Sequence, residues 1–200
     1  MEKLKMNEKE SLAIIAMMIQ ETREYIHKGV GNTQLLWGYL TVIVSLGVYF
    51  GWEYTHSQLV LWGWWVLPLI GWPTMYLMMR HQPHKVVTVI DKIIGKVWMV
   101  IGITATITPI VAFLMPSNIL FIEALLISIG IAITGLILNM KVCYIPGFIG
   151  ILLSFALFWV RGIDQILIFA LLFTILLIIP GHIMNYMANK NQKTSLCSEN

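Results

Sequence analysis

Long apolar stretches without Lys or Arg in their interiors are the feature that most constrains this chain. A helix needs about 20 such residues to cross the roughly 30 Å hydrocarbon core of a bilayer. Six stretches qualify, at about residues 35–52, 57–79, 93–115, 119–138, 142–160 and 165–187. A membrane β-barrel would instead show short segments of alternating polarity. The pattern predicts an all-α, polytopic membrane protein with six transmembrane helices in three hairpins.

The composition excludes the other common classes of protein. Of the 200 residues, 58% are hydrophobic and 12% are charged, which is about half the charged share of a typical soluble domain. A soluble fold would need more charge on its surface, and a disordered chain would have far fewer apolar residues. Two cysteines, Cys143 and Cys197, are too few for a disulfide-rich secreted domain.

The positive charges indicate how the spans are oriented, because Lys and Arg are enriched in cytoplasmic loops. With a cytoplasmic N-terminus, 12 of the 13 Lys and Arg residues fall on the cytoplasmic side and Arg161 alone falls outside. We therefore expect a membrane protein with both termini in the cytoplasm and both cysteines on the reducing side, outside any structural disulfide. The chain then divides into an N-terminal segment over 1–34, a transmembrane domain over 35–187 and a tail over 188–200.

The N-terminal segment predicts a cytoplasmic amphipathic helix over residues 8–28. Its apolar residues recur at steps of three and four, the spacing of one helix face. This seam consists of Leu12, Ile15, Ile19, Thr22 and Ile26. We expect Gly29 and Gly31 to end the helix before the first span. The seam either packs against the protein's own cytoplasmic ends or docks a second copy or a partner protein.

Two sequence segments near the N-terminus are considered together, because one leads into the other. NEKESLAIIAMMIQ is followed, after a charged stretch, by QLLWGYLTVIVSLG. Over roughly the first 50 residues this resembles a family of small, uncharacterised bacterial multi-pass membrane proteins, in which an E-S-[LI] helix leads into a first span with the pattern L-[LF]-W-G-[YW]. The resemblance implies the same architecture and a place in the inner membrane of a bacterium. Since that family has no established activity, it adds no site residues.

A second cytoplasmic element is expected at about residues 85–97, before the third span. Apolar and polar residues separate there onto two faces, as in a helix lying in the membrane interface. The neighbouring His81 and His84 have a metal-like spacing, but Pro83 interrupts a helix between them and no nearby cysteine adds a third ligand. We expect contact with lipid headgroups and no metal.

Small residues and prolines suggest an internal repeat. In the first span Gly38, Thr41 and Ser45 have the same spacing as Gly147, Gly150 and Ser154 in the fifth. The second and sixth spans are both interrupted by Pro and Gly, at 68–73 and at 180–181. Breaks in corresponding positions are typical of transporter sites, because broken helices expose backbone dipoles. The breaks are equally compatible with ordinary helix kinks. The matching spacings of the two spans are compatible with chance.

Four polar residues within or next to the spans are candidate binding residues: Glu123, His182, Asn139 and Asn185. Glu123 is the one acidic residue inside a predicted span, and intramembrane acids mark ion or proton pathways. It lies near the outer end, so it could also reach out to water. The other three lie near the inner end, where they either hydrogen-bond between helices or bind a solute.

These features favour two functions. The first is a non-enzymatic inner-membrane protein with an accessory or regulatory role, acting through protein–protein contacts of its amphipathic helix. The alternative is a small oligomeric transporter or channel that uses Glu123 or the His182 region. An enzyme is not expected, because the spans contain no second acid and neither an H-E-x-x-H nor a G-x-S-x-G motif. The expected partners are the lipid bilayer and a second copy or another protein, with no cofactor and no nucleic acid.

Overall fold

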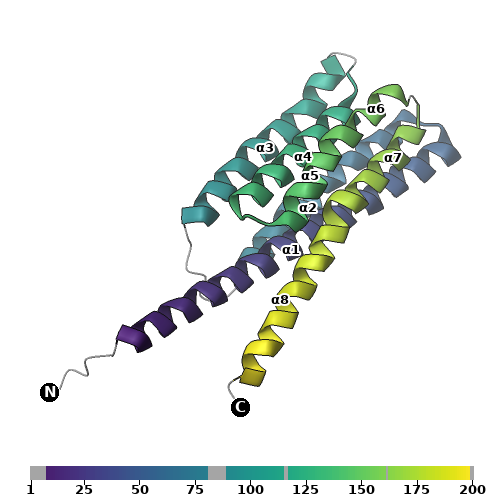
Figure 1. Ribbon diagram of the computed structural model, residues 1–200. Helices are drawn as coiled ribbons and strands as arrows, with labels where there is room; N and C mark the ends of the chain where they lie inside the picture. The colour runs from purple at the N-terminus through teal and green to yellow at the C-terminus, as the bar shows by residue number, and fades with distance from the viewer. Residues whose placement is uncertain (1–7, 81–88, 115–116, 161, 199–200) are drawn as a thin grey trace.

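The protein is all-helical throughout the part of the chain that the computed structural model describes, residues 8–80, 89–114, 117–160 and 162–198. Figure 1 shows the helices gathered into one elongated bundle. The elements in chain order are α1 (Glu8–Thr55), the 3₁₀ helix η1 (Gln58–Trp65), α2 (Val66–Arg80), α3 (Val89–Leu114), α4 (Ile119–Ile137), α5 (Lys141–Ser154), α6 (Ala156–Trp159), α7 (Asp164–Phe173), the π-helical turn η2 (Thr174–Ile178) and α8 (Ile179–Ser198).

Five helical passages in the described chain are long and apolar enough to cross a membrane. They are Gly29–Thr55, Ile90–Val111, Ile119–Ile137, Lys141–Trp159 and Asp164–Lys190. Each of them overlaps one of the predicted spans, so the prediction of a helical membrane protein is confirmed. The predicted span at 57–79 is instead divided between η1 and the 15-residue α2.

The N-terminal helix continues into the first span without a break. Helix α1 is a single helix of 48 residues, so the prediction that Gly29 and Gly31 end a separate helix is wrong. Gly31 serves close packing instead: a Cβ at this position would lie 2.5 Å from Asn185 Oδ1 and 3.1 Å from the Gly181 carbonyl oxygen. Glycine in a helix interior costs about 0.5–1 kcal/mol relative to alanine. Contact with α8 outweighs that cost here.

The other predicted cytoplasmic element lies partly outside the described residues, which resume at position 89. From Val89 the chain forms one continuous helix, α3, as far as Leu114. Residues 89–97 of the predicted interfacial helix therefore form the first turns of α3. His81 and His84 lie outside the described residues.

The segment after α1 runs back alongside it. Gly51 faces Val60, Gly63 faces Val48, and Gly71 lies against the ring of Trp37. The α1 residues in these three contacts descend in number as those of η1 and α2 ascend, so the two passages are antiparallel. A Cβ at Gly51 or Gly71 would overlap its neighbour, and a Cβ at Gly63 would make a tight contact of 3.0 Å with Val48 Cγ2.

Helices α4 and α5 form the closest hairpin. At Gly147 a Cβ would lie 2.5 Å from the backbone nitrogen of Ala132, and at Gly135 it would overlap the backbone of Tyr144. Asn139 closes the turn between them with a positive φ of 52°. The Met140 N–H donates to the Gly135 carbonyl and the Asn139 N–H to the Leu136 carbonyl, which is the hydrogen-bond pattern of a Schellman helix end.

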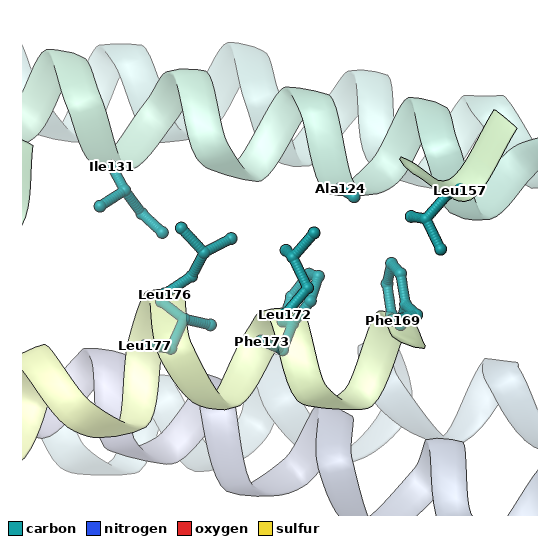
Figure 2. Packing of buried hydrophobic residues seen from close by; sticks show 8 residues of the cluster. All are labelled: Ala124, Ile131, Leu157, Phe169, Leu172, Phe173, Leu176 and Leu177. Atoms are coloured by element: carbon teal, nitrogen blue, oxygen red, sulfur yellow. The ribbon is translucent and has the colours of Figure 1, made fainter. Parts of the chain in front are cut away.

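The passage α7–η2–α8 supplies the centre of the hydrophobic core. Figure 2 shows its side chains facing those of α4 and α6. The buried cluster consists of Phe169, Leu172, Phe173, Leu176 and Leu177 together with Ala124, Ile131 and Leu157. The passage is irregular at its middle: the Ile179 N–H bonds the Thr174 carbonyl, five residues back, and Pro180 has no N–H to donate.

Candidate functional site

Two glycines bring α1 and α8 together at one end of the bundle. A Cβ at Gly31 would lie 3.1 Å from the Gly181 carbonyl, and a Cβ at Gly181 would lie 3.1 Å from the Gly31 carbonyl. Such small-residue contacts allow membrane helices to approach closely. Beyond this crossing the two helices diverge toward the free ends of the chain (Figure 1). We therefore considered the crossing as a candidate site.

Polar side chains from α1 and α8 meet at this crossing. Asn185 Nδ2 donates to Asn32 Oδ1 at 2.6 Å. Asn185 Oδ1 is buried and has no hydrogen-bond partner among the described residues. Asn185 therefore hydrogen-bonds between helices, and its partner Asn32 was not among the predicted residues.

Helix α5 adds sulfur to the same crossing. Gln34 is 5% exposed, and its Nε2 donates to Cys143 Sγ at 3.6 Å. Cys143 Sγ lies 3.2 Å from Met184 Sδ, and both side chains are fully buried. Gln34 Oε1 is buried without a hydrogen-bond partner in the described structure. Cys143 is free of any disulfide.

His182 lies on the exposed surface of α8, beside Tyr39 of α1. Its Nε2 lies 2.7 Å from Tyr39 Oη, and the two rings meet edge to face with centroids 6.0 Å apart. This pair forms a polar link between α1 and α8. Asn139 lies elsewhere, in the turn between α4 and α5, where the positive φ is its evident structural role. Asparagine adopts that conformation more readily than most residues.

Glu123 lies on the side of α4 that faces α3. On this side Gly130 lies against the side chains of Ile101 and Trp98, and Thr134 Oγ1 accepts from Trp98 Nε1 at 3.0 Å. Glu123 is seven residues before Gly130, which returns it to the same face of a helix with 3.6 residues per turn. Its Oε1 is buried with no hydrogen-bond partner among the described residues. Arg161, the cation predicted nearest to it, lies outside those residues.

The two stripes of small residues behind the suggested repeat are both buried. Gly38 packs on Leu177 and Ile178, while Gly150 packs on Leu176 and Ser128. The matching residues of the two stripes are 109 positions apart. Gln34 and Cys143, which contact each other, have the same separation. The stripes thus act as packing faces against the central passage, and the repeat stays a hypothesis.

Several site residues escaped prediction: Asn32 and Gln34 lie just before the predicted first span, and Tyr39 lies within it. Asn32, Gln34 and Tyr39 gain their meaning only from the helix that lies across from them. Their spacing on α1 offered a weak signal, since Gln34, Gly38, Thr41 and Ser45 repeat at three and four residues and are all buried. The seam residues Leu12, Ile15, Ile19 and Ile26 have side chains outside the described part of the structure.

Comparisons with protein-family models, curated proteins and solved structures find no match for this chain. The resemblance to a small bacterial membrane family therefore stays a prediction. The functional argument rests on the geometry of the helices.

Proposed function

We propose that this is a non-enzymatic, six-span membrane protein that acts through protein–protein contacts of the N-terminal part of α1. One observation carries the proposal: residues 8–28 continue α1 as an unbroken helix, about 30 Å long at 1.5 Å per residue, beyond the packed bundle (Figure 1). A helix that leaves the body with an apolar seam in its sequence is suited to laying that seam into a partner's groove.

The antiparallel course of η1 and α2 supports the sixth span. Their 8 and 15 residues extend about 38 Å together, at 2.0 Å per residue in a 3₁₀ helix and 1.5 Å in an α-helix. This length is sufficient for the roughly 30 Å hydrocarbon core. Six passes also agree with α1 beginning and α8 ending beyond the same end of the bundle (Figure 1).

The distribution of Lys and Arg supports placing that shared end in the cytoplasm of a bacterial cell, with the bundle in the inner membrane. Cysteine labelling tests the span count and the orientation together. In a background without Cys143 and Cys197, an impermeant thiol reagent added outside is expected to label Thr55→Cys but not Gln82→Cys. Equal labelling of the two would leave η1 and α2 on one side and reduce the spans to five.

Photocrosslinking from the seam tests the proposed contact. A photoreactive residue at Ile19, on the seam, is expected to capture a specific product in cells, and the same residue at Glu21 serves as the matched control on the opposite face. The mass of the product separates a second copy of this chain from another protein. With the photoreactive residue kept at Ile19, Ile15→Glu is expected to abolish the product while leaving the melting temperature of the purified protein unchanged. A large loss of melting temperature would show that the seam packs on the protein itself.

A small oligomeric transporter or channel is the second candidate. It is favoured by the irregular passage at η2 and Pro180, beside the polar crossing with its unpartnered amide oxygens. Broken membrane helices commonly border solute sites. Its pathway would use Glu123 or the His182 region. Under this function Glu123→Gln, which keeps the side-chain volume, is expected to abolish flux in reconstituted vesicles while preserving folding. Unchanged flux would remove Glu123 from the pathway.

A further inference from the structure

We propose that Glu123 is a proton-binding site: a neutral carboxylic acid held between α3 and α4, level with the proline break in α3. The inference is independent of both functions proposed above, because it concerns the chemical state of one buried group. It holds for a docking protein as well as for a transporter.

The contacts between α3 and α4 place Glu123 opposite Thr108 and Pro109. The two helices are antiparallel, because Trp98 meets Thr134 and Ile101 meets Gly130. Seven residues further along in each direction, the same register joins Thr108 to Glu123. The burial pattern on α3 agrees: Thr108 and Pro109 are half-buried, whereas the flanking Ile107 and Ile110 are exposed.

The break in α3 provides an acceptor at this level. Pro109 has no N–H, so the Ala105 carbonyl lacks its usual helical donor four residues on. Ala105 is half-buried and lies on the same face of α3 as Ile101 and Thr108. The Thr108 hydroxyl does not compensate, because it donates to the Thr104 carbonyl at 2.8 Å. A protonated Glu123 can supply the missing O–H donor, whereas an ionised carboxylate would only add another acceptor.

Among the described residues, which do not include Arg161, the charges on the elements packed against α4 offer Glu123 no cation. On α3 they are Asp91, Lys92 and Lys96, and on α5 Lys141, all of which lie toward the opposite end of α4 by this register. On α7 the charged residue at the Glu123 end is Asp164, which is exposed and acidic. Helix α6 has no charged residue. A carboxylate in the membrane without a positive partner is unfavourable, so binding a proton is the way for Glu123 to remain buried.

Carbodiimide labelling tests the proposal on the full-length protein in lipid nanodiscs. The apolar reagent dicyclohexylcarbodiimide reacts with protonated carboxyl groups of the protein. The acid proton moves to a nitrogen of the reagent, and the carboxyl oxygen bonds to its central carbon. The adduct then rearranges to a stable acylurea. Mass spectrometry then locates the label. At neutral pH we expect Glu123 to be labelled at least tenfold faster than Asp164. A water-soluble carbodiimide with an amine nucleophile is expected to reverse that preference.

The infrared spectrum provides a second measurement that does not depend on reagent access. The carbonyl stretching band of a protonated carboxyl group is expected in the wild-type protein and absent from Glu123→Gln, while Asp164→Asn retains it. Failure of Glu123 to react with the apolar reagent, or loss of the band in neither variant, would show an ionised or solvent-exposed carboxylate and overturn the proposal. Unchanged flux in Glu123→Gln would remove Glu123 from a transport pathway and would leave the proposed proton-binding site unaffected.

Discussion

Helix α3 and the passage α7–η2–α8 are both apolar enough to cross a membrane, but they have opposite places in the bundle. In the most apolar stretch of α3, 6% of the residues are buried. In the most apolar stretch of the passage from Asp164 to Lys190, 50% are buried. The passage contacts α1, α4 and α5, whereas α3 packs mainly on α4. Apolar composition therefore indicates which segments enter lipid, but it does not indicate which helix lies at the centre of the bundle.

The reason for the difference lies in the neighbours. Glycines on α1 and α5 let the passage approach closely, as where Gly38 meets Leu177 and Gly150 meets Leu176. On α3, Gly95 has no atom close to it among the described residues. In lipid, helices associate through close packing and polar contacts rather than through hydrophobicity. Close contacts at Gly38 and Gly150 therefore help to place the passage at the centre of the bundle.

The strongest test of this contrast removes a large side chain from each region. Leu176→Ala, at a fully buried position, is expected to lower the free energy of unfolding by about 2–5 kcal/mol, because it leaves a cavity. Ile103→Ala on α3, where the side chain is 53% exposed, is expected to change it by less than about 0.5 kcal/mol. Reversible unfolding in mixed micelles measures both. Equal losses would show that a further chain covers α3 in the folded protein.

A second test replaces with alanine one glycine that faces the passage and one glycine on α3. The expected changes in the free energy of unfolding have opposite signs. Gly150→Ala would place a Cβ that overlaps the side chain of Leu176 in the passage, so we expect a loss of about 1–3 kcal/mol from overpacking. Gly95→Ala has open space and is expected to raise the stability by up to about 1 kcal/mol through helix propensity. The same unfolding assay measures both. Destabilisation by Gly95→Ala would indicate a close contact on that face of α3.

The smallest expected effect concerns the polar link that holds α3 to the bundle. Trp98→Phe removes the 3.0 Å hydrogen bond to Thr134, and bonds of this kind contribute about 0.6 kcal/mol on average in membranes. A double-mutant cycle with Thr134→Val isolates the coupling from lost ring contacts. A coupling energy near zero would leave α3 held by packing alone.

Prediction from sequence succeeded where the bilayer acts as the solvent. The predicted span 119–138 matches α4 almost to the residue, because hydrocarbon thickness dictates length and backbone hydrogen bonding dictates helix. The prediction failed at Gly29 and Gly31, where glycine was interpreted as a helix end. A glycine fits either a helix end or a close contact between helices. At Gly31 the presence of Asn185 on the facing helix shows that close contact is its role.

The candidate site shows the same limit. The sequence indicated that Glu123 and Asn185 are unusual, since polar groups inside lipid are costly wherever they lie. It could not indicate that Asn32 would bond Asn185, or that Asn139 would instead close the turn of α4. Those roles depend on residues more than 100 positions apart or on the local dihedral angles of a turn.

The amino-acid sequence by itself determined the class of the protein, the positions of its apolar helices and the residues that lipid disfavours, because each follows from local composition and the dimensions of the bilayer. Only the tertiary structure decided that η1 and α2 return along α1, that α7–η2–α8 forms the centre, and that α3 packs on the face of α4 that carries Gly130 and Thr134. Which helix faces which depends on complementary shapes between distant segments, and no single stretch of the chain contains that information.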